Sequence, residues 1–523
     1  MDTKPARRRL FNKKEWSWIM YDWANSIYAT NIMAAIYPTI FASTVENGDI
    51  RWGYATSAAT LIVAILAPIL GAIADYKGMK KKLFTLFMLI GVVFTPLMVA
   101  FGNWKIALIG YVVSRIGFSG SCLFYDSFLT DVTTDERMDK VSSWGYAMGY
   151  IGGSTIPFVI SIAILLLFDY STFAQTFSVL IVSAWWLVFS FPMLKNVHQE
   201  HYEEKPAHFS VGRIFSDVLR TFKKICTNRG LLFFVLAYFF YIDGVDTIIS
   251  ISTAYGSTLG LGSTGMIIAL LVTQIVAMPC SIFFAKISEK FSARKALIGA
   301  VVIYLCVTLV GFYMGFSMEP EQEAYNKVFD EAYAGLDIKA LSVGEDEALR
   351  IKNDFVSEYQ SKKADDAAKD IAAMTKVYSP FCLKSNAEAL RETEEAYIRT
   401  ALADAYEANA DKAEAFRSAI SFSSLLFWIM AVMVGTVQGG IQAVSRSYFG
   451  KLIPKDQSNE FYGFFDIFGK FAAFLGPFIY ATIGSLNPGH PSYGVLGLSA
   501  LFLVGLILLI SGKKHMSATE HIK

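Results

Sequence analysis

Long apolar stretches, separated by short polar ones, run through most of the chain. A helix needs about 20 predominantly apolar residues to cross a bilayer, and twelve such windows follow one another here. They lack the period-two alternation of transmembrane β-strands. The pattern therefore predicts an all-α membrane protein with twelve transmembrane helices, which we expect at 15–43, 53–75, 83–101, 105–130, 141–168, 172–194, 230–256, 262–286, 296–317, 419–449, 459–483 and 493–512.

Lysine and arginine residues gather in alternate connections between these windows, and such basic loops stay on the cytoplasmic side. They fill the leader before the first helix, the loops after the second and eighth helices, and the middle loop 195–229. The opposite short loops carry almost none, with Arg51 and Lys105 as exceptions. We expect both termini and the middle loop in the cytoplasm. The leader "MDTKPARRRLFNKKEW" lacks the small-residue cleavage site of a signal peptide.

One polar segment, residues 318–418, interrupts the second set of helices. It holds 13 Lys or Arg against 22 Asp or Glu, a net charge of −9, and its composition favours helix. The count of helices before it places it outside the cytoplasm. We expect a small helical cap that is structural, gathers substrate or docks a partner. The predicted organisation is an N-terminal six-helix half at 1–194, a cytoplasmic linker at 195–229, helices 7–9 at 230–317, the acidic insert at 318–418, and helices 10–12 with a cytoplasmic tail at 419–523.

The composition supports a membrane protein and excludes several kinds of site. Of 523 residues, 54% are hydrophobic and 17% charged, whereas soluble domains carry about 25% charged residues. The five cysteines show no metal-type spacing, and all six histidines fall outside the predicted spans. We therefore expect no metal, no cofactor and no enzyme activity, and proton chemistry inside the membrane would have to use carboxylates. Nothing indicates a nucleic-acid partner.

The two sets of helices repeat each other. "GAIADYKGMKKK" after the second helix matches "AKISEKFSARKA" after the eighth at an offset of 214, pairing Asp75 with Glu289. "DWANS" matches "DGVDT" at 221, which pairs Asp22 with Asp243 and Asn25 with Asp246. Beyond the insert the offset becomes 320, so that Asp126 corresponds to Arg446. The jump is close to the length of the insert. Two six-helix halves in parallel arrangement, the second interrupted, explain all three registers.

These motifs carry a family resemblance. "GAIADYKGMKKK" resembles the major facilitator signature, Gly-x-x-x-Asp-x-x-Gly-x-basic-basic, with Lys where Arg is more usual. "YDWANSIYAT", "GYAMGYIGG", "LAYFFYIDGVDT" and "SRSYFGKLIPKDQSNEFYGFFDIFGKFAAFLGP" look like the vacuole-effluxer-like branch, whose fungal members are linked to amino-acid release from the vacuole. The resemblance covers about four-fifths of the chain and does not extend to the insert. It implies a major facilitator fold that moves a solute.

Ionisable residues inside predicted spans mark functional sites by default. Asp22 and Asn25 share one face of the first helix, and Asp243 and Asp246 share one face of the seventh. In the superfamily that the chain resembles, helices 1, 4, 7 and 10 line the central cavity. The residues that we expect at the cavity are Asp22, Asn25, Tyr28, Arg115, Asp243, Asp246, Gln438, Gln442 and Lys470, and the candidates for proton coupling are Asp22, Asp243 and Asp126.

A second group of residues is expected at a cytoplasmic gate. By resemblance, Asp75 caps a neighbouring helix there and holds an arginine while the gate is closed. The group comprises Gly71, Asp75, Gly78, Lys80, Lys81, Glu289, Arg294, Asp126, Arg446 and Asp466. Structural roles stay open for several residues of both groups: Asp466 and Lys470 can form an intrahelical ion pair, Asp126 and Arg446 can be contacts between the halves, and Arg115 can bridge packed helices. Glycines of "GYAMGYIGG" would let helices approach closely.

The mixture of carboxylates and basic groups suits a solute that carries both charges. We expect a monomeric secondary active transporter of amino acids or short peptides in a bacterial inner membrane, working by alternating access and coupled to an ion, the proton. Carboxylates toward helices 1 and 7 would take the cationic group or the proton, and Arg115 or Lys470 would take a carboxylate. The alternatives are an exporter of amphiphilic compounds or lipids, and a receptor that does not transport and uses the insert as its ligand domain.

Overall fold

The computed structural model describes residues 10–46, 48–204, 211–261, 263–338, 341–360 and 387–521. Within these ranges the regular elements are helices, joined by a single isolated β-bridge between Tyr76 and Glu203. The all-helical class is therefore confirmed. The elements are α1 (Lys13–Ile27), η1 (Tyr28–Ala34), α2 (Ile36–Thr44), α3 (Gly48–Ala74), α4 (Met79–Phe94), α5 (Leu97–Ala100), α6 (Trp104–Ser127), α7 (Leu129–Val132), α8 (Met138–Met148), η2 (Gly149–Thr155), α9 (Ile156–Leu167), α10 (Thr172–Asn196), α11 (Val211–Thr227), α12 (Arg229–Thr258), α13 (Ser263–Phe291), α14 (Ala293–Ala334), α15 (Glu345–Gln360), α17 (Ala387–Ala408), α18 (Ala410–Leu452), η4 (Lys455–Gln457), α19 (Ser458–Leu486), α20 (Ser492–Ser511) and α21 (Lys513–His521).

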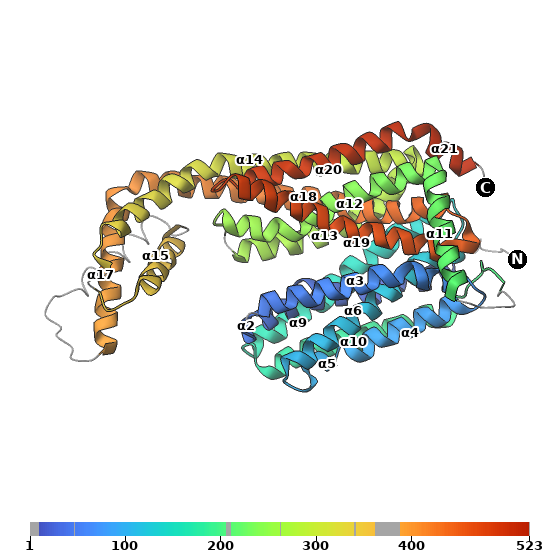
Figure 1. Ribbon diagram of the computed structural model, residues 1–523, viewed down its shortest axis with the longest axis horizontal. Helices are drawn as coiled ribbons and strands as arrows, with labels where there is room; N and C mark the ends of the chain where they lie inside the picture. The colour runs from blue at the N-terminus through green and yellow to red at the C-terminus, as the bar shows by residue number, and fades with distance from the viewer. Residues whose placement is uncertain are drawn as a thin grey trace, which may run out of the picture.

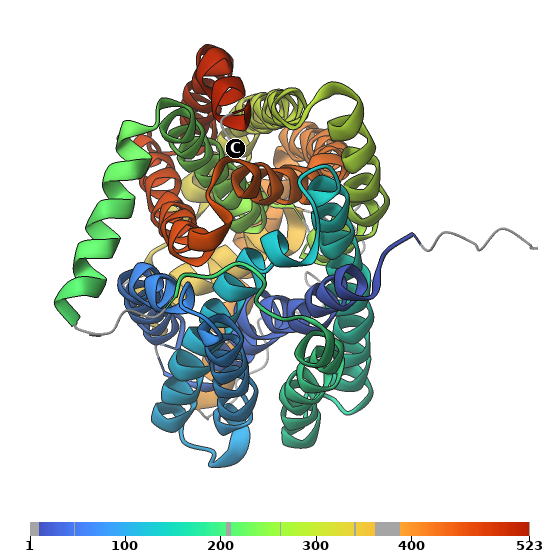
Figure 2. The ribbon, with the colours of Figure 1, turned by 90° about the vertical axis from the view of Figure 1, so that its right-hand side faces the viewer.

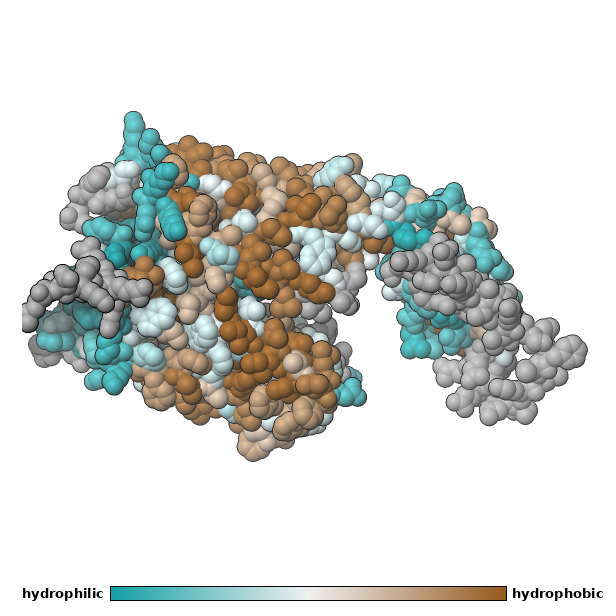
Figure 3. All heavy atoms as spheres, turned by 180° about the vertical axis from the view of Figure 1, so that it is seen from behind, coloured by the Kyte–Doolittle hydropathy of each residue, from teal (hydrophilic) through white to brown (hydrophobic). Residues whose placement is uncertain are grey.

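Eleven of the described helices are long and apolar enough to cross a membrane. The first predicted span, 15–43, is not among them, because polar side chains such as Asp22 and Asn25 lower its hydropathy. α1, η1 and α2 follow one another along this segment, and the chain breaks helical geometry at Ala35. Figure 3 shows the apolar side chains as a broad band between hydrophilic residues at the two ends.

The helices form two halves that lie side by side (Figure 1). The first half runs from α1 to α10 and the second from α12 to α20. Corresponding helices pack alike: α1 lies against α10 and α8, and α12 lies against α20 and α19. The halves meet through α3 with α19 and through α8 with α13, which are equivalent pairs under the sequence repeat. Both termini lie at one end of the molecule, which we call the terminal end.

Two continuous helices carry the insert. α14 has 42 residues and α18 has 43, so each is about 63 Å long, roughly twice the thickness of the hydrocarbon core. The insert boundaries expected at 318 and 418 fall inside these helices. Their outer parts pack with α15 and α17 around a separate apolar core, which contains Phe329, Phe355 and Tyr406. Figure 1 shows this assembly projecting beyond the end opposite the termini and curving across it.

Candidate functional site

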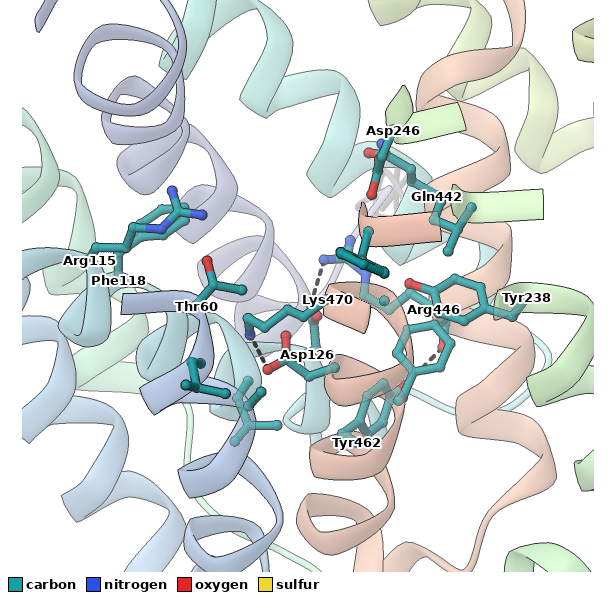
Figure 4. Close-up of a pocket in the computed structure, with 18 of the residues that line it drawn as sticks. Thr60, Arg115, Phe118, Asp126, Tyr238, Asp246, Gln442, Arg446, Tyr462 and Lys470 are labelled. Carbon is teal, nitrogen blue, oxygen red and sulfur yellow. Dashed lines mark hydrogen bonds and ion pairs between the residues drawn. The ribbon is translucent and has the colours of Figure 1, made fainter. Parts of the chain in front are cut away.

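A cavity of about 1040 Å³ lies between the two halves. α3 and α6 supply most of its wall on one side, and α12, α18 and α19 on the other (Figure 4). Much of the wall is aromatic, from Phe118, Tyr146, Tyr238, Tyr462, Phe465 and Phe474. Thr56, Thr60 and Gln442 add neutral hydrogen-bonding groups. The volume and the mixed lining suit a small solute with both apolar and polar parts.

Six charged side chains line the cavity, three acidic and three basic: Asp126, Asp246, Asp466, Arg115, Arg446 and Lys470. Four of them neutralise one another. Arg446 Nη1 lies 2.9 Å from Asp126 Oδ1, and Lys470 forms an ion pair with Asp466 one helical turn away.

The other two, Arg115 and Asp246, form no hydrogen bond or ion pair with any described residue. The Nε atom of Arg115 is buried without a hydrogen-bond partner. Arg115 belongs to α6 in the first half and Asp246 to α12 in the second half. The cavity therefore offers one cation and one anion from opposite walls, both free to bind a solute (Figure 4).

Arg446 joins the two halves beside the cavity. Besides Asp126, its guanidinium contacts Asp22, with Nη2 lying 3.4 Å from Oδ2, and Nε donates to the Ser142 hydroxyl at 3.0 Å. The rings of Trp18 and Tyr146 stack 4.7 Å and 4.5 Å from its central carbon. A side chain from α18 thus inserts into the first half, and its charge is balanced there by two carboxylates.

Asp75 fastens the terminal end at the contact of α3 with α19. Its carboxylate accepts hydrogen bonds from the backbone N–H groups of Asn459 and Glu460, each at 2.9 Å. These are the first free amides of α19, so Asp75 acts as a cap supplied by the other half. Asp75 therefore binds the N-terminal end of α19, and the arginine that we expected it to hold is not among its hydrogen-bond donors in the described part of the chain. A Cβ on Gly71 would come within 2.5 Å of the Asn459 carbonyl oxygen, which explains the glycine.

Lys80 and Asp139 add further buried ties at the same end. Lys80 Nζ donates to Asp131 at 2.7 Å and to the Ser458 hydroxyl of the other half at 3.0 Å. Asp139 accepts from Ser288 at 2.5 Å, from Ser447 at 2.7 Å and from Lys451 at 2.6 Å, all in the second half. The terminal end is therefore closed by charge-assisted hydrogen bonds.

The structure brings some predicted cavity residues together and leaves others apart. Arg115, Asp246, Gln442 and Lys470 line the cavity, as do Asp126, Arg446 and Asp466 from the predicted gate. Five predicted cavity residues are not among the lining residues: Asp22, Asn25, Tyr28, Asp243 and Gln438.

Asn25 and Tyr28 point into the packing of the first half. The Asn25 amide lies 3.6 Å from the Cys122 sulfur, and the Tyr28 and Ser114 hydroxyls are 2.7 Å apart. Asp243 is fully buried against α19. Its Oδ1 accepts from the Gly476 N–H at 2.9 Å, and its Oδ2 has no hydrogen-bond partner within the described part of the chain.

The remaining predicted gate residues lie near the terminal end without joining the halves. Gly78 is the N-cap that precedes α4, and its φ of 72° is a left-handed conformation that favours glycine. Lys81 Nζ lies 3.2 Å from His198 Nδ1, and Arg294 donates to the Leu509 carbonyl at 3.3 Å. Glu289 is exposed, unlike its counterpart Asp75, and the adjacent Ser288 makes the contact with the other half.

Several lining residues escaped the sequence analysis. Thr56 and Thr60 stand one helical turn apart on α3, and that spacing of hydroxyls inside an apolar span was a usable signal. The aromatic residues gave none, because 15% of the chain is aromatic and most such residues pack elsewhere.

Comparisons with known proteins agree with this architecture. The family model described as "Vacuole effluxer Atg22 like" matches residues 52–323 and 423–521. An uncharacterized MFS-type transporter, YxiO of Bacillus subtilis, is 36% identical over 515 residues, covering 95% of this chain and 94% of that protein. Autophagy-related protein 22 of Coccidioides immitis is 20% identical over 531 residues, covering 87% and 71%.

Solved structures show the same fold at low identity. The crystal structure of the major facilitator transporter FucP in the outward conformation superposes with a TM-score of 0.55 at 13% identity, covering 96% of this chain and 98% of that one. The family match leaves out residues 324–422, which correspond to the insert and the outer ends of its two carrier helices.

Proposed function

The chain belongs to the vacuole effluxer Atg22-like family of major facilitator transporters, and from that premise we propose that it moves a small zwitterion of the amino-acid class by alternating access. It is a multi-pass membrane protein and not an enzyme. The family description, a vacuole effluxer, supports release of the solute from a compartment. The alternating basic loops support a bacterial plasma membrane with the terminal end in the cytoplasm.

The observation that carries this proposal is the pair of uncompensated charges, Arg115 and Asp246, on opposite walls of one cavity. A guanidinium binds a carboxylate through two parallel hydrogen bonds, and a carboxylate binds an ammonium group. A zwitterion would satisfy both at once, whereas a simple anion or cation would leave one of these half-buried charges unpaired, which is costly. Because the two groups belong to different halves, such a solute would also draw the halves together.

Transport would follow from breaking one set of contacts while another forms. With the terminal end closed by Asp75, Lys80, Asp139 and Arg446, the solute would enter from the opposite end. Binding between Arg115 and Asp246 would favour closure on that side. The ties at the terminal end would then open to release the solute.

Exchange of labelled amino acids in proteoliposomes tests the proposal. Charged hydrogen bonds contribute about 1.5–3 kcal/mol, so Arg115→Gln and Asp246→Asn should each weaken solute affinity by about 10- to 150-fold. The ligand should be trimmed in parallel, using the amine that lacks the carboxylate and the acid that lacks the ammonium group. Arg115→Gln should no longer matter for the amine, and Asp246→Asn should no longer matter for the acid.

Lys105→Gln, an exposed residue far from the cavity, serves as the matched control and should leave exchange unchanged. Equal losses for the intact amino acid and for both trimmed ligands would contradict the assignment, because they would show general damage to the transporter. Unchanged exchange in both variants would contradict it as well.

Proton coupling forms the second part of the proposal. Asp22 and Asp126 both share Arg446, so a proton on either would compete with an ion pair. Asp243 is different, since Oδ1 accepts hydrogen bonds from the neutral donors of Gly476 and Thr247, and Oδ2 has no hydrogen-bond partner among the residues that the structure describes. It can take a proton without breaking an ion pair, which favours it among the three candidates.

Two other functions keep specific support. The aromatic wall of the cavity favours a solute with a large apolar part, so amphiphilic compounds belong in the same exchange assay.

The other alternative is a receptor that uses the insert as its ligand domain, and it requires that solute binding depend on the insert. Replacing residues 335–409 with a short linker, which keeps α14 and α18 whole, should preserve exchange in a transporter and abolish ligand binding in a receptor.

A further inference from the structure

The linker between the halves contains one helix that runs across the spans. α11 leaves the direction of the other helices and lies across the bundle at the terminal end (Figure 1). Seen along the spans from that end, it occupies the outer edge of the molecule (Figure 2). A helix in this position lies at the level where the spans leave the membrane, and the surrounding lipid reaches it.

One face of α11 is fixed to both halves. Thr221 and Ile225 are each 1% exposed. Asp217 accepts a hydrogen bond from the hydroxyl of Tyr76 at 3.4 Å, just beyond the end of α3. Lys224 Nζ donates to Gln457 at 2.6 Å, just before α19 begins. The helix is thus held in place by the protein, and its other faces have a defined direction.

A second face of α11 is apolar and uncovered. Leu219, Phe222 and Cys226 stand at positions i, i+3 and i+7, so they share one side of the helix. Leu219 is 69% exposed and Phe222 is 46% exposed, and Cys226 is exposed as well. A leucine or phenylalanine side chain is more stable in an apolar environment than in water, so this face favours a covering apolar phase.

A third face is basic and borders the apolar one. Arg220 has a side chain that is 61% exposed and lies 3.2 Å from Asp217, and Lys223 is exposed beside it. Protein-bound, apolar and basic faces therefore follow one another around the helix. Helices that lie in the plane of a membrane surface have this arrangement of an apolar and a basic face.

We propose that α11 is a binding surface for anionic lipid. Leu219, Phe222 and Cys226 enter the boundary of the acyl chains, and Arg220 and Lys223 contact the headgroups. Figure 3 shows the apolar side chains of the spans giving way to hydrophilic residues at the terminal end, and α11 lies at that end (Figure 1). Its apolar face therefore lies at the level where the apolar band ends, and its basic side chains are of the kind that an anionic surface attracts. A binding surface for a soluble partner protein would not need to lie next to the apolar band of the spans.

The native cysteine on the apolar face allows a direct test. Cys122, Cys280, Cys306 and Cys382 are replaced by serine, and Cys226 is labelled with an environment-sensitive fluorophore. The protein is placed in nanodiscs of phosphatidylcholine, alone or mixed with phosphatidylglycerol, and lipids with brominated acyl chains serve as quenchers. The matched control moves the label to the basic side through Cys226→Ser with Ser216→Cys, an exposed position one turn before Arg220.

Bromine should quench the label at Cys226 and spare the label at Ser216→Cys, and phosphatidylglycerol should strengthen the quenching. Arg220→Glu with Lys223→Glu should remove that dependence on phosphatidylglycerol, and Arg220→Lys with Lys223→Arg should retain it. The charge-matched control, Lys327→Glu with Arg350→Glu, lies on the exposed insert and should change nothing. Absent quenching at Cys226, equal quenching at both sites, or charge reversal without effect would overturn the proposal.

Discussion

Arg446 shows how two equivalent positions of a repeated chain come to touch. Asp126 and Arg446 are 320 residues apart, the same offset that relates the two halves in sequence. Positions related by a two-fold axis meet when they lie close to that axis, so the repeat that aligned them also explains their ion pair. The opposite charges make the contact attractive, whereas two copies of either residue would repel.

Removing the arginine should destabilise the closed molecule. Arg446→Gln leaves Asp22 and Asp126 without their cation, and breaking a buried ion pair costs about 3–5 kcal/mol. Thermal unfolding of the purified protein should show a clear fall in Tm. Lys455→Gln breaks a half-exposed ion pair with Asp135 between the halves, 3.1 Å long, and should lower stability by less than about 1 kcal/mol. Additive losses in Arg446→Gln, Asp126→Asn and the double variant would argue against a direct interaction.

Replacing Asp243 with asparagine, which cannot take up a proton, should have a different effect on transport from the same change at Asp22 or Asp126. Asp243→Asn should keep solute exchange and lose accumulation driven by a pH gradient, since only the proton site is removed. Asp22→Asn and Asp126→Asn should impair both, because each disturbs Arg446. Accumulation in proteoliposomes under a pH gradient measures this, and a variant Asp243→Asn that still accumulates solute would refute the role of Asp243.

The sequence identified the polar and charged residues inside the spans, but it did not show which of their side chains face the cavity. Arg115, Asp246, Gln442 and Lys470 stood out as polar groups inside apolar spans, and all four line the cavity. Asn25 and Tyr28 stood out for the same reason but are buried within the first half. The face of a helix toward the cavity cannot be read from polarity when the opposite face packs on polar groups such as Ser114.

At the scale of elements, close packing of α1 against η2 depends on glycine. A Cβ on Gly153 would clash with Ser26 and approach the backbone carbonyl oxygens of Asp22 and Trp23 at 3.1 Å. The glycines of "GYAMGYIGG" predicted close approach, and this is confirmed. The two π-helices, η1 and η2, were not predictable, because a shift in hydrogen-bond spacing leaves no mark on residue composition.

Gly153→Ala should therefore cost about 1–3 kcal/mol of stability, as overpacked cores do. The matched control is Gly299→Ala on α14, where a Cβ meets no atom within 4 Å. That change should be neutral or stabilising by up to about 1 kcal/mol, since alanine is the better helix former. The two Tm values test the claim, and equal effects would contradict it.

The insert is fastened by Glu394, whose carboxylate accepts from the backbone N–H groups of Ser342 and Val343 at 2.8 Å and 2.9 Å. Burial opposes ionisation, but the hydrogen bond from the Ser342 hydroxyl and those from the two backbone N–H groups outweigh it and lower the pKa of Glu394. Because the folded form holds its proton less tightly, this stabilisation is present at neutral pH and is lost as the pH falls below the ordinary value near 4.5. The protection factors at 341–344, which correct for the pH dependence of intrinsic amide exchange, should fall on acidification, and Glu394→Gln should lower them at neutral pH. Protection factors at 341–344 that do not change with pH would contradict this.

For the whole molecule, the repeat predicted two halves, whereas the closed end could not be predicted. One sequence must support both open and closed states, and the ties of Asp75, Lys80 and Asp139 belong to one of them. A contact at the gate therefore exists only in the fraction of molecules whose terminal end is closed. A state favoured by a few kcal/mol holds nearly all molecules, and losing that preference redistributes them.

Asp139→Asn should shift the population toward an open terminal end, because it weakens three hydrogen bonds to the second half. Spin labels at Glu136 and Lys290, both exposed and on opposite halves, should report a longer distance. Asp135→Asn weakens a half-exposed ion pair with Lys455 and should leave the distance distribution nearly unchanged. Identical distributions in the two variants would show that Asp139 does not hold this end.

The two long helices that carry the insert couple its position to the movement of the second half. α14 and α18 pass from the second half into the insert as continuous helices, so a rocking of that half must swing the insert as one body. Displacement grows with distance from the pivot, and the tip would travel further than any point within the membrane. A fluorophore on α15 would then undergo a large displacement in each transport cycle. A molecule that bound the insert and held it in place would slow transport.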